Sequence, residues 1–368
     1  MQPGPFLWEC PVLSTSLRPV HRTGSARPIP PGFRPVRTAS LLAIGAALLL
    51  AACGGPGGGA SSTVTSGTTG GSSAGTTSPV ATPSVPTSPV STVIAVHQFP
   101  VTVHASNGTV TLSGAPHRIV SLSPSLTEIL YAVGAGGQVV AVDSNSNYPA
   151  GVPTTKLSGF QPNVEAIAGY HPDLVVASND TNGLVSGLKA LSVPILLLPA
   201  ANTLADSYQQ ETTLGAATGH AAAAQQVVST TQRRIAAAIA SVGTEAKGLS
   251  VYHELDNTYY SVTSSTFIGG LYRMFGLANI ADSAAKAASG YPQLSAEYVV
   301  RSAPGLIVLA DGKCCGQSAA TVAKRPAFSG VPAVTSGRVV VIDDDIASRW
   351  GPRIADFAEA IAAVLKRG

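Results

Sequence analysis

The sequence predicts an α/β protein with two Rossmann-like lobes that a single long helix bridges. Short apolar runs alternate with helical stretches in two sets, one before residue 219 and one after residue 243. This alternation is typical of parallel sheets covered by helices. Between the sets, residues 220–242 are rich in strong helix formers and contain neither Gly nor Pro. At about 1.5 Å per residue, such a helix spans roughly 34 Å and makes a stiff connection.

The first lobe is assigned to residues 98–218. Its predicted strands are short apolar runs at 118–122, 139–143, 173–177 and 194–198. Helices are predicted at 125–133, 164–168 and 183–190. The first of these helices is expected to begin with a capping box, in which Ser125 and Glu128 satisfy backbone N–H groups. A hairpin at 99–112 precedes the sheet, with Asn107 and Gly108 as its turn.

The bridging helix is assigned to residues 219–243 and the second lobe to residues 244–368. Strands of the second lobe are predicted at 249–255, 306–310 and 338–342. Its helices are predicted at 267–275, 296–301 and 352–366. The two lobes therefore repeat one architecture on either side of the long helix.

Residues 1–52 are predicted to be an export signal that ends in a lipobox. Two arginines precede an apolar run at 41–50, and two alanines follow this run directly before Cys53. The run is shorter than the about 20 residues that a transmembrane helix needs, and small residues before a cleavage site are typical of secretory signals. The segment resembles bacterial lipoprotein signals. This resemblance implies cleavage before Cys53, lipidation of that cysteine and a place on the outer face of the cytoplasmic membrane.

Residues 53–97 are predicted to be a lipidated, disordered tether. No charged residue occurs from Gly54 to Val96, and Gly, Ser, Thr and Pro dominate the stretch. Such a composition cannot bury enough apolar surface to fold. A flexible chain of about 40 residues reaches on the order of 35 Å, so the anchor would keep the folded lobes beside a membrane partner.

Charge and motif content exclude several classes of function. The formal net charge is +3, but residues 1–52 alone carry +4, because they hold five arginines and one glutamate. The rest of the chain is near neutral, which removes the electrostatic basis for nucleic-acid binding. The seven histidines are scattered without metal-ligand spacing, and neither H-E-x-x-H nor C-x-x-C occurs. We therefore expect neither an enzyme nor a site for a bare metal ion.

Two adjacent cysteines, Cys314 and Cys315, follow a predicted strand of the second lobe in the sequence ADGKCCGQS. This position after a strand puts them where loops face a cleft or its rim. In an oxidising compartment the two cysteines either bridge each other or stay as thiols. A vicinal disulfide is therefore one hypothesis, while a zinc site needs more ligands than this pair offers.

Specific motifs follow one another through both lobes. The first lobe contains HRIVSLSPSLTEILYAVGAGGQVVAVD, SNYP and LSGFQPNVEAIAGYHPDLVVAS. The second contains FIGGLYRMFGLANIAD, YPQLSAEYVVRSAPGLIVLADG and SRWGPRIADF. From Pro116 to essentially the carboxyl end, the chain closely resembles the periplasmic vitamin B12 and ferric-siderophore binding proteins. The resemblance implies the class III periplasmic-binding-protein fold, with a ligand in the cleft between the lobes. It also implies an ABC importer, whose membrane permease subunits and cytoplasmic ATPase are the partners.

The resemblance implies a set of ligand-binding residues in this cleft. They are Tyr148, Phe160, His253, Phe267, Tyr291, Arg349 and Trp350. Broad aromatic rings suit the flat surface of a corrin or a catecholate, and Arg349 suits a carboxylate, an amide or a phosphate. Tyr291 stands where cobalamin binders tend to have a tryptophan. For each single aromatic residue, packing in the core is the alternative interpretation.

Two glutamates match positions that dock the family to its permease. Glu165 in NVEAIAG and Glu297 in LSAEYVV correspond to glutamates that form salt bridges with arginines of the two permease subunits. One exposed carboxylate on each lobe fits a pseudo-twofold docking surface, where charge pairs fix the register. The alternative is that both carboxylates only complement the helix dipoles at their amino ends.

The expected function is capture of a metal chelate by a monomer that needs no separate cofactor. The chelate is cobalamin or another corrinoid, a ferric siderophore, or haem. The aromatic residues of SNYP and SGFQ and the paired glutamates favour cobalamin, whereas the tyrosine at 291 weakens that assignment. Two alternatives stay open, namely a haem-binding subunit of the same importer class and an orphan ligand sensor on the same fold. Because the bridging helix is stiff, we expect only a small closure of the lobes on binding.

Overall fold

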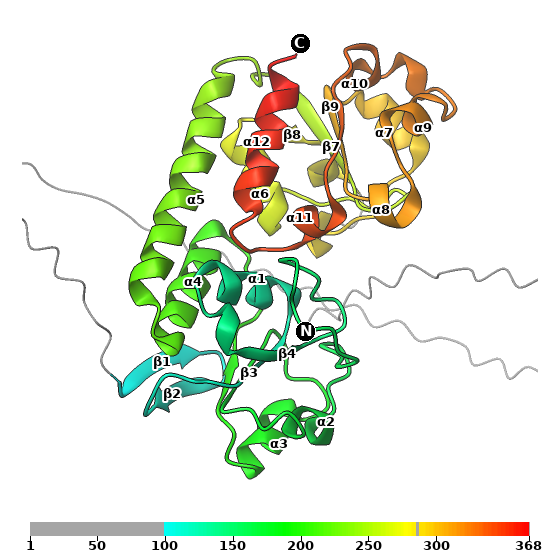
Figure 1. Ribbon diagram of the computed structural model, residues 1–368. Helices are drawn as coiled ribbons and strands as arrows, with labels where there is room; N and C mark the ends of the chain where they lie inside the picture. The colour runs from blue at the N-terminus through cyan, green and yellow to red at the C-terminus, as the bar shows by residue number, and fades with distance from the viewer. Residues whose placement is uncertain (1–98, 285–286, 368) are drawn as a thin grey trace, which may run out of the picture. The chain divides into compact units, whose positions relative to one another are not determined.

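The computed structural model describes residues 99–284 and 287–367. These residues form two lobes, each built on a four-stranded parallel sheet, and Figure 1 shows the long helix α5 beside both. The predicted export signal and tether, with Cys53, lie outside the described residues. None of the helices in the described part of the chain combines the length and the apolar character that crossing a bilayer requires. The predicted α/β fold class is confirmed.

The sheet of the first lobe has the strand order β4-β3-β5-β6. Its strands are β3 (Ile119–Leu122), β4 (Val139–Val142), β5 (Leu174–Ala177) and β6 (Ile195–Leu197). Every residue of β3 and β5 is buried, because both faces of the sheet are covered. The helices of this lobe are α1 (Pro124–Ala132), α2 (Val164–Ala168), α3 (Leu184–Ala190) and α4 (Leu204–Thr218).

A hairpin precedes this sheet and consists of β1 (Val101–Ala105) and β2 (Gly108–Leu112). Ala105 pairs with Gly108, so the two-residue turn ends at Asn107 and lies one position before the predicted turn. The Asn107 side chain also donates to the Ile195 carbonyl and accepts from the Leu197 N–H group, both at 3.0 Å. The turn residue thereby fastens the hairpin to strand β6, which a local turn pattern cannot predict.

The sheet of the second lobe has the order β10-β9-β7-β8. Its strands are β7 (Ser250–Glu254), β8 (Ala278–Asn279), β9 (Leu306–Leu309) and β10 (Val339–Val341). Its helices are α6 (Phe267–Met274), α7 (Ala296–Ser302), α8 (Gly312–Cys315), α9 (Ala319–Ala323), α10 (Pro332–Thr335), α11 (Asp344–Ser348) and α12 (Ile354–Leu365). Short 3-10 helices are η1 (Gly136–Gln138), η2 (Ile280–Ser283), η3 (Ala287–Ser289) and η4 (Phe328–Gly330). The predicted strands and helices of this lobe are present, whereas β8 and α8 to α11 are too short to leave a periodic pattern in the sequence.

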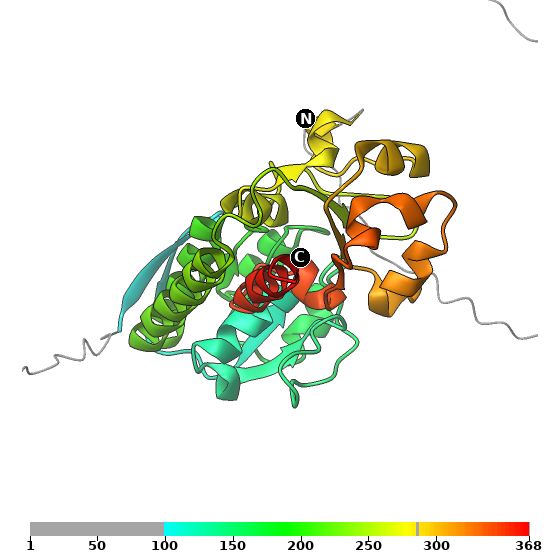
Figure 2. The same cartoon turned by 90° about the horizontal axis from the view of Figure 1, so that it is seen from above.

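The long helix α5 (Ala221–Val242) contributes to the cores of both lobes. Near its start, Ala224 packs into the first lobe, where a Cβ atom on Gly215 of α4 would lie 2.3 Å from the Ala224 Cβ. Further along, Ile235 packs into the core of the second lobe. Arg234 adds ion pairs to α12, and Figures 1 and 2 both show α12 beside α5. The bridging helix is therefore a packed part of each lobe, which supports the predicted stiffness.

Two helix starts differ from the sequence prediction. Helix α4 has no counterpart among the predicted helices. Thr203 and Asp206 nevertheless form a capping box at its start, and Gly219 ends it with a φ of 83°. In α1 the predicted capping box of Ser125 and Glu128 is wrong, because no side chain caps this helix. The carboxylate of Glu128 instead contacts the second lobe.

Candidate functional site

Three of the predicted ligand-binding aromatic residues are exposed. Tyr148 (44% exposed) and Phe160 (43%) lie between β4 and α2, and Tyr291 (37%) lies just before α7. The first two follow the carboxyl end of a parallel strand, the edge where open α/β sheets bind ligands. Aromatic side chains contribute large contact areas when a flat ligand covers them. The exposed part of each ring lies at the surface, and contact of these rings with a ligand stays a prediction.

The loop that carries Tyr148 is held to the first lobe through Asp143, at the carboxyl end of β4. The Asp143 carboxylate accepts hydrogen bonds from Ser146 Oγ at 2.5 Å and from the Asn145 N–H group at 3.2 Å. Burial raises the pKa of Asp143. Ser146 also shares a hydrogen bond with Thr127 of α1 at 2.9 Å. A hollow of about 310 Å³ opens beside this loop and is lined by its residues.

Arg349 of the second lobe is hydrogen-bonded to the same loop. Its Nη1 atom donates to Glu128 Oε1 and to Asn147 Oδ1, both at 2.8 Å. Its Nη2 atom donates to the Asn145 carbonyl at 3.1 Å and to Asp345 Oδ1 at 2.7 Å. Only 9% of the side chain is exposed. The expectation that Arg349 faces a ligand is thus corrected, since its terminal nitrogens already bind protein groups.

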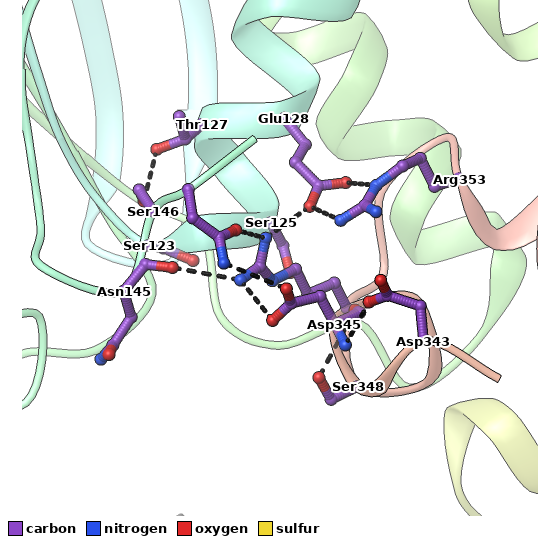
Figure 3. A network of polar contacts seen from close by, with 12 residues as sticks. Ser123, Ser125, Thr127, Glu128, Asn145, Ser146, Asp343, Asp345, Ser348 and Arg353 are labelled. Atoms are coloured by element: carbon purple, nitrogen blue, oxygen red, sulfur yellow. Dashed lines mark hydrogen bonds and ion pairs between the residues drawn. The ribbon is translucent and has the colours of Figure 1, made fainter. Parts of the chain in front are cut away.

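Arg353, just before α12, forms a second contact between the lobes. Its Nε atom donates to Glu128 Oε2 at 2.8 Å, and its Nη2 atom donates to Glu128 Oε1 (Figure 3). The Arg353 guanidinium carbon also lies 4.0 Å from the centroid of the Tyr148 ring. One arginine of the second lobe therefore contacts both a buried carboxylate and an exposed aromatic residue of the first.

Trp350 is held between the lobes. Its indole Nε1 donates to Gln210 Oε1 of α4 at 2.8 Å, and its backbone N–H group donates to Ser125 Oγ at 3.3 Å. Its carbonyl accepts a hydrogen bond from Ser207 Oγ. The side chain is only partly buried, so a contact of its ring with a ligand stays a prediction.

His253 occupies the core, which corrects the expectation that it lines a cleft. It is fully buried on β7, and its Nδ1 atom lies 2.6 Å from the Tyr272 hydroxyl. The rings of Tyr272 and Phe357 lie 5.8 and 6.4 Å from its own. Burial lowers the pKa of His253 to about 3, so the imidazole is neutral. His253 is buried because β7 is a central strand with neighbouring strands on both sides. Phe267, at the start of α6, packs against the same core while partly exposed.

Glu165 and Glu297, the two predicted docking residues, occupy equivalent exposed positions in the two lobes. Each is exposed in the first turn of a short helix, α2 for Glu165 and α7 for Glu297. The two helices begin alike, because Asn163 and Ser295 accept backbone N–H groups with their side chains. Backbone and Ser295 hydrogen bonds lower the pKa of Glu297. Among the described residues neither glutamate forms an ion pair, and their role in docking stays a prediction.

Cys314 and Cys315 lie in α8, with Cys314 exposed and Cys315 partly buried. The Asp344 carboxylate of α11 accepts the Cys314 N–H group at 2.9 Å and the Lys313 N–H group at 3.1 Å. The helix that carries the cysteines is therefore anchored to α11, next to Arg349. The vicinal disulfide stays a prediction.

A buried acidic pair lies at the carboxyl ends of β7 and β9. Arg325 donates to both oxygens of Glu254, at 2.5 and 2.6 Å. Asp311 is fully buried, and its carboxyl oxygens have no hydrogen-bond partner among the described residues. Burial, and then the negative charge of Glu254, raises the pKa of Asp311 to about 8. The single arginine therefore pairs with Glu254, and burial beside that carboxylate favours the protonated form of Asp311.

Sequence reasoning misses Glu128, Asn147, Asp345 and Arg353 as members of the polar network between the lobes. For Glu128 a signal exists, because this glutamate stands in the apolar stretch LTEIL of a predicted helix. A carboxyl group on a buried helix face is either protonated or paired, most often with a cation. That argument predicts an arginine or lysine partner, but it does not identify which one.

Comparisons with known proteins match most of the described chain. A family model described as "Periplasmic binding protein" matches residues 119–346. An uncharacterized ABC transporter substrate-binding lipoprotein of Bacillus subtilis is 31% identical over 278 residues, which cover 72% of this chain and 85% of that protein. A cobalamin-binding protein of Halobacterium salinarum is 32% identical over 267 residues, which cover 70% of this chain and 72% of that protein.

A solved structure from Staphylococcus epidermidis has the same architecture. It is described as a possible iron-binding, periplasmic solute-binding protein and superposes with a TM-score of 0.58 at 26% identity. The match covers 68% of this chain and 99% of that structure. The architecture is therefore shared with a protein described as possibly iron-binding, whereas the Halobacterium relative is named for binding cobalamin.

Proposed function

Because the chain belongs to the periplasmic binding protein family, whose members carry solutes and catalyse no reaction, we propose that it captures cobalamin or a related corrinoid for import. Its two parallel-sheet lobes and single long helix form the class III periplasmic-binding-protein fold. The chain is a substrate-binding protein of an ABC importer, so its partners are a permease and an ATPase.

Tyr148, Phe160 and Tyr291 carry the proposal that the ligand is a corrinoid. These exposed aromatic residues offer apolar surface to a broad, flat ring system. A negatively charged ferric siderophore, in contrast, is best recognised by arginines that are free to donate hydrogen bonds. Both arginines beside the Tyr148 loop, Arg349 and Arg353, already bind the Glu128 carboxylate. The name of the Halobacterium relative supports the same ligand.

Ferric siderophores and haem are the alternatives. The Staphylococcus neighbour described as possibly iron-binding favours the first of these. Haem needs an axial ligand, and the neutral, fully buried His253 is not accessible as one. A tyrosine would then have to supply the axial ligand of the haem iron. Haem therefore ranks behind the corrinoid as the proposed ligand.

Calorimetric titration of the purified protein with cyanocobalamin, haemin and ferrichrome tests this ranking. We expect cyanocobalamin to bind and to quench tryptophan fluorescence. The signal should come from Trp350, because the only other tryptophan, Trp8, lies in the predicted export signal. Changing Tyr148 and Phe160 to alanine should abolish the heat of binding, whereas the control Leu191→Ala, an exposed apolar residue after α3, should not. If only ferrichrome or haemin binds, that compound replaces the corrinoid as the proposed ligand. If none of the three compounds binds, the proposal that the ligand is a metal chelate is rejected.

The chain is further proposed to be a monomer held at the outer face of the cytoplasmic membrane by lipid on Cys53. The lipobox supports the anchor, and the Bacillus relative is named a lipoprotein. Cys53→Ser should move the protein from the membrane fraction to the soluble fraction, because acyl chains then no longer hold it. A variant that stays in the membrane fraction would contradict the anchor.

The rival within this fold is an orphan ligand sensor without a transporter. Genes for a permease and an ATPase next to this one would favour import over sensing. Uptake of cyanocobalamin that depends on this chain would decide the question, since a sensor would leave uptake unchanged.

A further inference from the structure

Arg353 touches two side chains of the first lobe that differ in chemistry and in exposure. Glu128 is only 2% exposed and receives hydrogen bonds from two nitrogens of the Arg353 guanidinium. Tyr148 is 44% exposed, and the same guanidinium lies 4.0 Å from its ring centroid. This distance is well within the about 6 Å at which a cation and an aromatic face attract each other.

The pair with Glu128 fixes where the guanidinium lies. A planar guanidinium that binds both oxygens of a carboxylate has a defined plane and direction. Because the Arg353 side chain is only 15% exposed, removing one partner would leave a nearly buried charge without its counter-charge. The Glu128 carboxylate therefore holds the Arg353 guanidinium in place, and the exposed Tyr148 ring lies against it.

The neighbours of Tyr148 are fastened to the second lobe as well. Arg349 binds the Asn145 carbonyl and the Asn147 side chain. The Asn147 Nδ2 atom donates to Asp345 Oδ2 at 3.0 Å. Residues of the second lobe thus hold the loop at the positions just before Tyr148, while part of the ring surface stays exposed.

From this arrangement we infer that Arg353 is a positioning residue for the ligand site and acts through Tyr148. It occupies one face of the ring and fixes the direction in which the free surface of the ring points. The second lobe thereby sets the geometry of a ligand contact that belongs to the first lobe, before any ligand binds. Such preorganisation reduces the ordering that binding would otherwise require. The inference rests on the proposed function only in taking Tyr148 as a ligand contact.

A double-mutant cycle without ligand tests the coupling of the two residues. Tyr148→Leu and Arg353→Met are made singly and together, and urea unfolding of the full chain is followed by circular dichroism. We expect the two changes to be non-additive, with a coupling of about threefold or more in the unfolding equilibrium constant. Arg353→Lys provides a second cycle if the Met variant does not fold, because lysine keeps a cation near Glu128 but has no planar group to stack.

Arg234→Met is the matched control for this cycle. Arg234 also binds two carboxylates, those of Asp356 and Glu359, but it bridges α5 and α12 without contacting Tyr148. Its combination with Tyr148→Leu should be additive. Additive behaviour of the Arg353 pair would overturn the inference, whatever the loss of stability in each single variant.

The same variants then separate this inference from the proposed function. With cyanocobalamin as the probe, Arg353→Met should weaken binding about tenfold in the wild-type background. It should have no further effect once Tyr148 is leucine, because the residue through which it acts is gone. A residue with a purely structural role would weaken binding equally in both backgrounds, which would contradict the inference. If the wild-type protein does not bind cyanocobalamin, the proposed function fails, while the ligand-free cycle still decides the role of Arg353.

Discussion

Glu128 and Arg349 lie 221 positions apart in the sequence, yet Oε1 of the glutamate accepts a hydrogen bond from Nη1 of the arginine at 2.8 Å. Arg353 binds the same carboxylate from the same lobe. The lobes are therefore joined by the packed helix α5, by this buried ion cluster and by the hydrogen bonds of Trp350. Several connections restrict hinge motion more than a single helix does, which agrees with the small closure expected on binding.

Replacing Glu128 by glutamine should lower the free energy of unfolding by about 3 kcal/mol, because the nearly buried Arg353 loses its carboxylate partner and Arg349 keeps only that of Asp345. Urea unfolding at neutral pH measures this loss. The matched control is Glu359→Gln, which breaks an ion pair whose carboxylate is 47% exposed and should cost less than about 1 kcal/mol. Equal losses in the two variants would contradict the structural role of Glu128.

Asp311 should make stability fall as the pH rises. Burial, and then the charge of Glu254, raises its pKa from 3.8 to about 8 in the folded chain. Between these values the folded chain holds a proton that the unfolded chain releases, so unfolding becomes easier with rising pH. The slope of the unfolding free energy reaches about 1.4 kcal/mol per pH unit for one such group.

Asp311→Asn removes this titration and should flatten the decrease of stability between acidic pH and pH 8. Thermal or urea unfolding over that range measures the slope. Burial also raises the pKa of Glu211 to about 8, so Glu211→Gln should flatten the slope by a separate amount. An Asp311→Asn variant with the slope of the wild-type protein would show that this carboxyl is already ionised in the fold.

Exchange of Glu165 and Glu297 for alanine should separate docking from binding. If the carboxylates dock the chain to a permease and do not contact the ligand, we expect unchanged affinity for cyanocobalamin and an about tenfold lower uptake. The control is Glu245→Ala, another exposed glutamate, which should leave uptake unchanged. If the two glutamates only complement their helix dipoles, uptake will persist and stability alone will fall, by about 0.5 kcal/mol for each residue.

The parts of the fold that the sequence predicts well depend on local chemistry. Helix α2 has the predicted bounds Val164–Ala168, because Asn163 caps its start and Gly169 follows its end. Helix α5 is recognised from its composition alone. In contrast, α4 escapes prediction because its buried residues include Ser207, Gln210 and Glu211, so polar side chains hide its apolar periodicity.

The candidate site is predicted less completely, for a related reason. The exposure of Tyr148, Phe160, Glu165 and Glu297 agrees with their expected roles. The burial of His253 depends on how many elements cover β7, and the occupation of Arg349 depends on residues of the other lobe. Motifs identify residue types at the site, but they do not give the partners that decide whether a charge is free.

Cys314 and Cys315 supply the remaining prediction. Because the chain is expected outside the cytoplasm, where oxidising conditions favour disulfides, we expect the two cysteines to form a vicinal disulfide. Mass spectrometry of the unreduced protein after alkylation should find neither cysteine labelled, and reduction should make both reactive.

Cys314→Ser then provides the control, because the remaining thiol should be alkylated without reduction. The Asp344 carboxylate holds the backbone of this helix at the Cys314 N–H group, so the variant should keep the fold while losing the bridge. Labelling of both cysteines in the unreduced wild-type protein would reject the disulfide.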